Sequence, residues 1–442
     1  MMKKNDVFVG TCHDLTNEAL GVVRVDGFCY FVKDLLPGEE AQIKVTAVKK
    51  NYGFGIVQQL LKVSEDRIEP ACGVFKCCGG CQLQHLSYLR QLEYKKRLVQ
   101  MNFVRIGGMD VQVEPCLGMS HPYQYRNKVQ VPVAGKGNDV KIGFFRRASN
   151  EIVEYENCPV QSDLQNQIVF TLKEWISEKG CASLFRHILI KHAHCTNEVM
   201  VVFIVRSYED VLQQLAIQCK QEFEQVKGVI ANINIRTDNV VLGEQEICLW
   251  GKEQIIEELE GLKFAISSKS FYQINPEQTH VLYRKVIEFA QLTTEENVLD
   301  LYCGTGTIGL FAAKYAQHVT GIEIVPEAID DAKKNAEVNG ISNIDFICSD
   351  AGSYARILAD RGELIDVILV DPPRKGLDNL TIDSMTMMKP KRIVYISCDS
   401  STLARDCAKL KQHGYQVVKV QPVDMFPQTT HTEVIILLQK QK

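Results

Sequence analysis

Asn297-Val-Leu-Asp-Leu-Tyr-Cys-Gly-Thr-Gly306 is the stretch that decides the fold of the C-terminal part of the chain. A short apolar strand runs into a glycine-containing turn, and a helical pattern follows through Ala316. Glycines in such a turn let the backbone approach a bound ligand closely. The G-x-G signal is weak by itself, because the third glycine of the dinucleotide fingerprint is missing.

Short apolar segments continue after this stretch at the spacing of alternating strands and helices. One intervening helix is expected over residues 326–339, because it opens with Pro326, and proline is tolerated in the first turn of a helix. Alternation of this kind predicts an α/β fold with a parallel, doubly wound sheet. The expected strands are residues 297–302, 319–324, 346–350, 367–371, 393–397, 417–420 and 434–438.

Acidic residues end several of these expected strands. Glu323 ends the second strand, where a carboxylate can accept hydrogen bonds from ribose hydroxyls. Asp350 ends the third strand, where it could bind an adenine. The pattern lacks a pyrophosphate-binding loop, which favours S-adenosylmethionine over NAD, with Gly304 in the turn that approaches it. Turn glycines with a helix-capping acid are the structural alternative, but three successive strand ends carry acids.

Asp371-Pro-Pro-Arg374 ends the fourth expected strand, and Cys398 ends the fifth. A similar Asp/Asn-Pro-Pro-aromatic element occurs in methyltransferases that act on amines, but Arg374 takes the aromatic position. An amine needs no covalent activation, whereas C5 of uracil becomes nucleophilic only after a thiolate adds to C6. Glu433, at the start of the last strand, is a plausible base for removing the C5 proton.

Taken together, these residues resemble the RNA uridine-5 methyltransferases that use S-adenosylmethionine. The resemblance covers nearly all of residues 265–442 and implies a class I methyltransferase domain with a seven-stranded sheet. It implies that Gln273, Tyr302, Glu323 and Asp371 bind the methyl donor, that Cys398 is the nucleophile and that Glu433 accepts the proton. Relatives often carry Asn or Pro where this chain has Asp399. The matching elements are Ser270-Phe-Tyr-Gln273-Ile-Asn275, Asp300-Leu-Tyr302-Cys-Gly304-Thr-Gly306, Glu323, Asp371-Pro-Pro-Arg-Lys-Gly376, Ser397-Cys398-Asp399, Thr402-Leu-Ala-Arg405-Asp406 and His431-Thr-Glu433.

A second group of cysteines lies upstream, in Cys72-x5-Cys78-Gly-Gly-Cys81. Three close thiols with one distant ligand could bind zinc, the usual metal for such sets in a cytosolic chain. The spacing also resembles the loop that holds a 4Fe–4S cluster in the larger uridine-5 methyltransferases. That resemblance implies a fourth ligand in Asn157-Cys158-Pro159, and a structural or RNA-orienting cluster is favoured over zinc.

Composition limits the class of protein. A chain of 442 residues is expected to form two or three domains. The N-terminus lacks an apolar leader and no stretch approaches membrane-spanning length, so the 16 cysteines are interpreted as reduced, in a cytoplasmic protein. The net charge is −4, yet residues 84–147 hold eleven Lys/Arg against four Asp/Glu. This basic segment is either a polyanion-binding surface or a solvated face.

Three domains are expected: residues 1–65, 66–262 and 263–442. Short strands at 21–25, 29–32, 41–45 and 55–57 predict a small β-barrel of the OB type, which resembles the TRAM module of RNA-modifying enzymes. The central part carries the cysteines, further strands and a helix over residues 88–105 that is a candidate to pack against the catalytic domain. Basic and aromatic residues that could contact RNA, or simply serve the core, are Lys44, Lys49, Lys50, Tyr52, Phe54, residues 125–128 and residues 144–147.

The resulting hypothesis is a monomeric enzyme that methylates C5 of a uridine in RNA. In the family that the chain resembles, a TRAM module with a cluster loop usually accompanies action on 23S rRNA, so transfer RNA is the second choice. Two rival functions remain open at this point. One is an amine N-methyltransferase, suggested by Asp371-Pro-Pro, and the other is a non-catalytic iron–sulfur RNA-binding protein.

Overall fold

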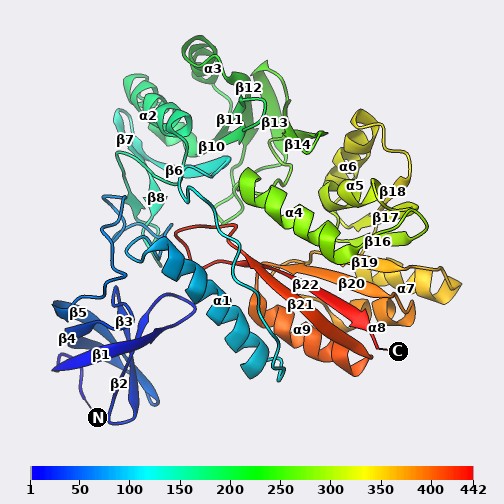
Figure 1. The fold of residues 1–442 in the computed structure, drawn as a ribbon. Helices are drawn as coiled ribbons and strands as arrows, with labels where there is room; N and C mark the ends of the chain where they lie inside the picture. Colours follow the sequence, from blue (N-terminus) through cyan, green and yellow to red (C-terminus); the bar gives the residue numbers. More distant parts are fainter. Residues whose placement is uncertain (1, 442) are drawn as a thin grey trace.

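The computed structural model describes residues 2–441, which form an N-terminal barrel, a central sheet and a C-terminal sheet (Figure 1). The barrel is closed, in the order β1-β2-β3-β5-β4, around Val23, Tyr30 and Ile43. Its strands are β1 (Val7–Leu15), β2 (Gly21–Val25), β3 (Phe28–Lys33), β4 (Glu40–Val48) and β5 (Tyr52–Lys62). Strand β1 is missing from the sequence prediction. Its pairing register shifts between Cys12 and Asp14, and this irregularity breaks the alternation that identifies a strand.

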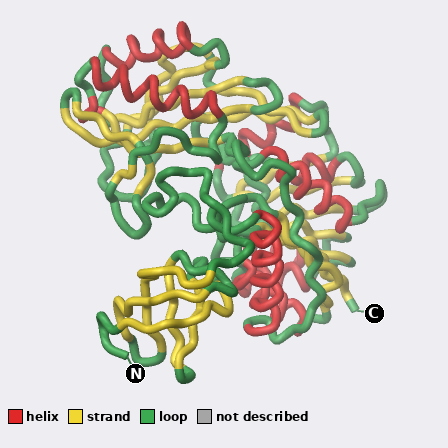
Figure 2. Tube along the Cα trace, turned by 60° about the vertical axis from the view of Figure 1, so that its left-hand side comes forward, coloured by secondary structure: helices red, strands yellow, loops and turns green. Residues whose placement is uncertain are grey.

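The central part is a six-stranded sheet in the order β13-β12-β11-β10-β6-β7. Helices α2 (Asp163–Glu178) and α3 (Val211–Glu222) lie along one face of it and share its apolar core (Figure 2). The hairpin of β14 (Gln254–Leu259) and β15 (Leu262–Ser267) leads on to the C-terminal part. The remaining elements are β6 (Lys128–Lys136), β7 (Asp139–Ile142), β8 (Phe144–Phe145), β9 (Ile152–Val153), η1 (Ala182–Leu184), β10 (Phe185–Ala193), β11 (Glu198–Val205), β12 (Val226–Ile233) and β13 (Gln245–Gly251).

The C-terminal part is a seven-stranded sheet in the order β18-β17-β16-β19-β20-β22-β21. Strands and helices alternate along the chain, which is the α/β fold that the sequence predicts. Its strands are β16 (Asn297–Leu301), β17 (His318–Glu323), β18 (Ile344–Cys348), β19 (Val367–Val370), β20 (Arg392–Ser397), β21 (Tyr415–Val423) and β22 (Glu433–Lys440). Its helices are α4 (Pro276–Ala290), α5 (Thr307–Ala313), α6 (Pro326–Val338), α7 (Ala351–Arg361), α8 (Asn379–Met387) and α9 (Ser400–Gln412).

One strand departs from the expected parallel sheet. Strand β22 pairs antiparallel with both β20 and β21, so the expectation of an entirely parallel sheet is wrong at this position. A single strand's apolar pattern is the same in either direction, so it does not report on strand direction. The reversal starts β22 at the edge where the parallel strands end.

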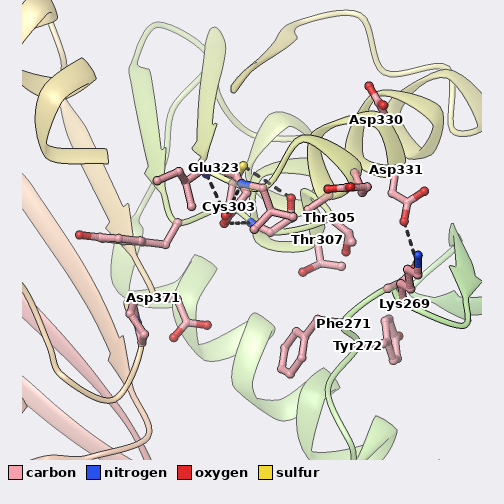
Figure 3. A pocket seen from close by; sticks show the side chains of 18 of the residues that line it. Lys269, Phe271, Tyr272, Cys303, Thr305, Thr307, Glu323, Asp330, Asp331 and Asp371 are labelled. Carbon is pink, nitrogen blue, oxygen red and sulfur yellow. Dashed lines mark hydrogen bonds between the residues drawn. The ribbon is translucent and has the colours of Figure 1, made fainter. Parts of the chain in front are cut away.

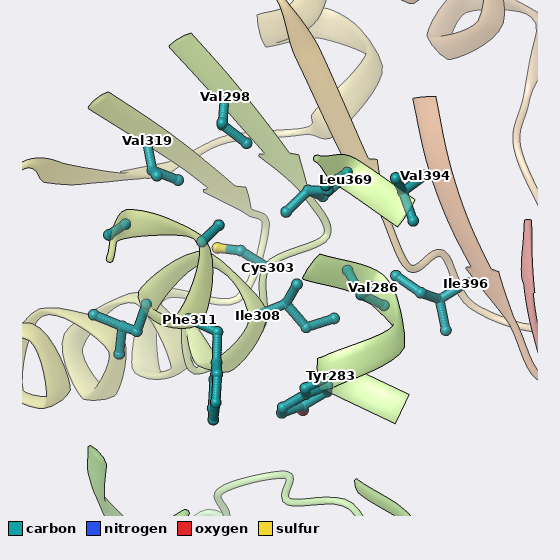
Figure 4. Close-up of a cluster of buried hydrophobic side chains, with 14 of the residues drawn as sticks. Tyr283, Val286, Val298, Cys303, Ile308, Phe311, Val319, Leu369, Val394 and Ile396 are labelled. Atoms are coloured by element: carbon teal, nitrogen blue, oxygen red, sulfur yellow. The ribbon is translucent and has the colours of Figure 1, made fainter. Parts of the chain in front are cut away.

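Helices cover both faces of this sheet. Strand side chains such as Val298, Leu369 and Ile396 meet Tyr283 of α4 and Ile308 of α5 on one face (Figure 4). The opposite face is covered by α7, α8 and α9, with a shared core of buried aliphatic side chains.

Helix α1 (Tyr88–Arg105) also packs on this second face, although it precedes the central sheet in the chain (Figure 1). Val99 and Phe103 are fully buried in the core shared with α9, and Asn102 Nδ2 donates to Ser400 Oγ at 2.7 Å. No helix within residues 2–441 combines the length and apolar character required to cross a membrane.

Candidate active site

A cavity of about 1000 Å³ opens at the carboxyl edge of the seven-stranded sheet (Figure 3). This is the edge where ligands bind in open α/β sheets. The cavity brings together the side chains that the sequence proposes for the methyl donor, from four strand ends and from the loop before α4. Those lining residues are Gln273, Tyr302, Gly304, Glu323, Asp350 and Asp371.

The turns after β16 and β17 hold Glu323 in a fixed position. The carboxylate of Glu323 accepts from the backbone N–H of Gly304 at 3.2 Å, of Ile324 at 2.8 Å and of Val325 at 3.0 Å. Gly306 has φ +78°, and a Cβ there would lie 2.6 Å from the ring of Phe346, so glycine is required. The three backbone donors fix the carboxylate at the cavity wall.

Asp350 and Gln273 enter the cavity wall from different elements. Asp350 is the N-cap of α7, and its Oδ1 accepts from Ser353 N at 2.9 Å and Ser353 Oγ at 2.8 Å. These hydrogen bonds hold the pKa of Asp350 below its usual value, so the carboxylate stays charged. The backbone oxygen of Gln273 accepts from Asn127 Nδ2 at 2.7 Å, which ties this loop to the central domain.

Cys398 and Glu433 lie at adjoining ends of two neighbouring strands. Ser397 of β20 pairs with Val434 of antiparallel β22, so the next two positions along, Cys398 and Glu433, are opposite each other. Burial, Glu433 and Asp371 raise the pKa of the half-buried Cys398 thiol to about 11, whereas the Arg374 guanidinium acts in the opposite direction. Asp399 caps α9 by accepting from Ser401 N at 2.8 Å, which fixes the turn after Cys398.

Asp371 is a further carboxyl group near this pair, and Asp300 lies near Asp371. Burial raises the pKa of Asp371 and of Glu433, and repulsion between them adds to the shift of Glu433, while Arg374 lowers it. Asp300 lies beneath the cavity, where burial raises its pKa to about 8, and its Oδ2 has no hydrogen-bond partner among the described residues. Neither Arg374 nor Asp300 was predicted as a site residue. A charged residue in the middle of an apolar strand is the signal that could have identified Asp300.

The four cysteines proposed as metal ligands gather between the barrel and the central sheet. Cys81 and Cys158 pack against Met119, Tyr125 and Val160. Cys72 and Cys78 are close enough to raise the pKa of Cys81, and Cys72 also raises that of Cys158. In residues 2–441 no group of three or more His, Cys, Asp or Glu side chains is arranged to hold a metal ion. All cysteines within residues 2–441 are free thiols.

The fold and the cavity define a class of protein, an S-adenosylmethionine-dependent RNA methyltransferase with an N-terminal TRAM domain. The TRAM domain matches residues 11–57, and the family described as tRNA (Uracil-5-)-methyltransferase matches residues 87–441. The chain therefore belongs to this family of RNA uracil-5 methyltransferases.

Relatives of nearly equal length support this assignment. An uncharacterized RNA methyltransferase of Halalkalibacterium halodurans is 44% identical over 448 residues, covering 99% of this chain and 98% of the relative. An uncharacterized RNA methyltransferase of Clostridium acetobutylicum is 43% identical over 453 residues, with coverage of 99% and 98%. The crystal structure of Pyrococcus abyssi tRNA (uracil-54, C5)-methyltransferase with S-adenosyl-L-homocysteine superposes with a TM-score of 0.75 and 28% identity. It covers 98% of this chain and 100% of the solved one.

Proposed function

We propose that this enzyme methylates C5 of a uridine in RNA through a covalent adduct between Cys398 and C6. The observation that carries the proposal is the pairing of Ser397 with Val434, which puts Glu433 opposite Cys398. Both side chains lie at the sheet edge that also forms the methyl-donor cavity. A nucleophile and a proton acceptor at one edge suit the two chemical demands of a pyrimidine carbon.

The reaction begins with a uridine extruded from its stack, because C5 and C6 are inaccessible within it. The Cys398 thiolate forms a bond to C6, and the C5=C6 electron pair becomes an enolate that is nucleophilic at C5. When bound, S-adenosylmethionine would supply the methyl group that C5 takes; the S–CH3 bond breaks and its electron pair leaves with S-adenosyl-L-homocysteine. The Glu433 carboxylate then removes the C5 proton. The C5–H electron pair restores the C5=C6 bond, and the C6–S bond breaks to release the thiolate.

The charged groups around Cys398 act on these steps in opposite directions. Arg374 is the cation next to the thiol, and it favours the thiolate that attacks C6. Glu433 is buried beside Asp371, which raises the pKa of its carboxyl group. A base with a raised pKa binds the C5 proton more strongly than an exposed carboxylate does. Arg374 therefore favours the attack, whereas the buried carboxyl groups of Glu433 and Asp371 oppose the thiolate and favour the later proton transfer.

We assign the methyl donor to the cavity residues. Glu323, fixed by three backbone amides, is proposed to hold the ribose, and charged Asp350 to face the adenine. Tyr302, Gly304 and Asp371 complete the wall on the strand side, and Gln273 comes from the loop before α4.

The experiment for the nucleophile compares Cys398→Ala with the unchanged protein in methyl transfer and in donor binding. We expect turnover to fall on the order of 10⁴-fold or more, as when the nucleophile of a covalent enzyme is removed. The affinity for S-adenosylmethionine should stay unchanged, since Cys398 does not line the donor cavity. Full activity of Cys398→Ala would eliminate the covalent route.

For the RNA, we propose 23S rRNA as substrate, with transfer RNA as the second candidate. One observation supports the second candidate: the solved structure of a tRNA (uracil-54, C5)-methyltransferase covers 98% of this chain, barrel included. The architecture alone therefore does not separate the two RNAs. Mapping 5-methyluridine in both RNAs from cells with and without the gene decides between them, because only the true substrate loses the modified base.

We propose that Cys72, Cys78, Cys81 and Cys158 hold a 4Fe–4S cluster. The donor set fits, because four thiols from two distant segments converge beside the buried guanidinium of Arg126, which offsets negative charge. When bound, the cluster would join these segments covalently. Iron, sulfide and zinc analysis of the purified protein and of Cys158→Ser tests this assignment.

The rival functions have distinguishable outcomes. An amine N-methyltransferase would yield a nucleoside methylated on nitrogen, and a non-catalytic RNA-binding protein would transfer no label from the methyl donor. Mass spectrometry of digested RNA separates both from 5-methyluridine. We also propose a cytoplasmic monomer, as suits an enzyme with reduced thiols and an RNA substrate.

A further inference from the structure

The segment between β21 and β22, residues 424–432, is buried although it has no regular secondary structure. Six of its nine residues are buried: Asp424, Met425, Pro427, Gln428, Thr429 and Thr432. Irregular segments normally lie at the surface, because their backbone polar groups need partners. This one finds its partners in parts of the chain that are about 300 residues away in sequence.

Helix α1 provides the first set of partners. Lys95 and Asp424 are both fully buried and form an ion pair, and Lys95 Nζ also donates to the Phe426 oxygen at 3.0 Å. Tyr88 Oη donates to Asp424 Oδ2 at 2.8 Å. A buried ion pair costs desolvation that only good geometry and further hydrogen bonds offset, so it fixes position more than it adds stability.

Gln428 is the second fixed point of this segment. Its φ is +71°, a conformation that is strained for any residue except glycine. Gln91 of α1 is fully buried and forms two hydrogen bonds with Gln428. Gln91 Nε2 donates to Gln428 Oε1 at 3.0 Å, and the Gln428 backbone N–H donates to Gln91 Oε1 at 3.1 Å. The backbone carbonyl oxygen of Gln428 accepts from the backbone N–H groups of Gln82 and Leu83, each at 3.0 Å. These two residues directly follow Cys81. The surroundings therefore hold the strained backbone from two sides.

Glu433 follows this segment directly and opens β22. The position of its carboxyl group is thus bounded by the β20 pairing on one side and by residues 424–432 on the other. We propose that Lys95 and Gln91 of α1 are positioning residues for the proton transfer by Glu433, acting through residues 424–432. The inference rests on the proposed role of Glu433 and adds a role for a helix outside the catalytic sheet.

A positioning role predicts which reaction step slows when Lys95 or Gln91 is changed. Displacement of a base by about 1 Å can cost on the order of 10²-fold in rate. None of residues 424–432 lines the donor cavity or forms part of the turn after Cys398, although Asn275 of the loop before α4 donates to the Met425 oxygen at 3.2 Å. A displaced Glu433 should therefore leave adduct formation and methyl transfer intact while it delays release of the product, so methylated adduct accumulates.

The test uses the full-length protein with substrate RNA and measures three quantities: kcat, the affinity for S-adenosylmethionine, and the denaturant-stable protein–RNA adduct at steady state. The variants are Gln91→Met, which removes the amide pair without stranding a charge, and Lys95→Met. Gln100→Met on the same helix is the matched control, since Gln100 has no hydrogen bond to residues 424–432 among the described residues. Glu433→Gln is the reference for a blocked proton transfer.

We expect Gln91→Met and Lys95→Met to lower kcat by about 10- to 100-fold and to accumulate methylated adduct, with donor affinity unchanged. Gln100→Met should match the unchanged protein. If Glu433→Gln accumulates adduct but the folded Gln91→Met variant does not, the positioning role is wrong and the role of Glu433 stands. If Glu433→Gln accumulates none, both fail. Thermal melting identifies a variant that does not fold. If Lys95→Met does not fold, the result for Gln91→Met decides whether the positioning role is correct.

Discussion

The seven-stranded sheet and the segment 63–127 that packs against it acquire their positions in different ways. The sheet strands are placed by local apolar runs that pair with close neighbours in register. Segment 63–127 contains α1 and long irregular stretches, and long-range side-chain contacts hold it, such as those of Lys95 with Asp424 and Tyr88 with Asp424. The sheet therefore carries the proposed reacting groups, whereas the irregular segment is proposed to align them.

The largest expected effect concerns the contact between these regions. Phe103 of α1 is fully buried against the sheet, so Phe103→Ala should lower the free energy of unfolding by about 3–5 kcal/mol through lost burial and a cavity. Its neighbour Val104 is 49% exposed, and Val104→Ala should change stability by less than about 0.5 kcal/mol. Urea unfolding of both variants measures the difference, and equal effects would mean that α1 does not dock on the sheet.

A second prediction concerns the sheet edge itself. Arg374→Met removes the cation next to Cys398, so the thiol pKa should rise further above about 11. Because the thiolate attacks, the rate rises with pH, and the variant should need a higher pH to reach a given rate. We expect a loss of about 10²-fold near neutral pH. The pH dependence of single-turnover methylation measures it. Arg374→Lys should retain part of the rate, and an unshifted profile in Arg374→Met would contradict this role.

The donor cavity gives a smaller effect. Glu323→Gln keeps the size of the side chain but removes the charge that three backbone amides hold. Hydrogen bonds to a charged group contribute about 1.5–3 kcal/mol, so S-adenosylmethionine affinity should fall by about 10-fold or more. Calorimetric titration checks this, with exposed Glu337→Gln on α6 as the control. Equal affinities in the two variants would remove Glu323 from the donor site.

The smallest expected effect concerns Asp350 and separates its role as the N-cap of α7 from its proposed role in donor binding. Asp350→Ala removes the N-cap of α7 and should lower stability by about 1 kcal/mol, whereas Asp350→Asn keeps a capping oxygen. If Asp350 also binds the donor, both variants should weaken donor affinity, while only Asp350→Ala destabilises the protein. Thermal melting with donor titration distinguishes the cases. Unchanged affinity in Asp350→Asn would leave capping as its sole role.

The sequence predicts the α/β fold and the strand ends because each depends on a short local pattern. The strand at 393–397 and the turn through Gly306 are two features that a short local pattern predicts. The direction of β22 is not predicted, because a strand pattern is symmetric, and β1 is missed because its register shifts at Cys12. The reversal of β22 is nevertheless what brings Glu433 to Cys398.

Contacts between distant segments are equally absent from the local pattern. Nothing near Lys95 in the sequence indicates Asp424 as its partner, and nothing near Gln428 predicts a positive φ. Residues such as Arg374 acquire a role only when the fold places them beside a thiol. The candidate nucleophile, base and donor residues can therefore be named from sequence, but not the side chains that align and tune them.

The most direct test of the central claim is the fate of RNA incubated with Glu433→Gln and S-adenosylmethionine. The account predicts a denaturant-stable species whose mass equals the protein plus the RNA plus one methyl group, with the link mapped to Cys398. Adding Cys398→Ala to the variant should abolish that species. Release of 5-methyluridine by Glu433→Gln at the rate of the unchanged protein, with no adduct at any time, would contradict the pairing of Cys398 with Glu433.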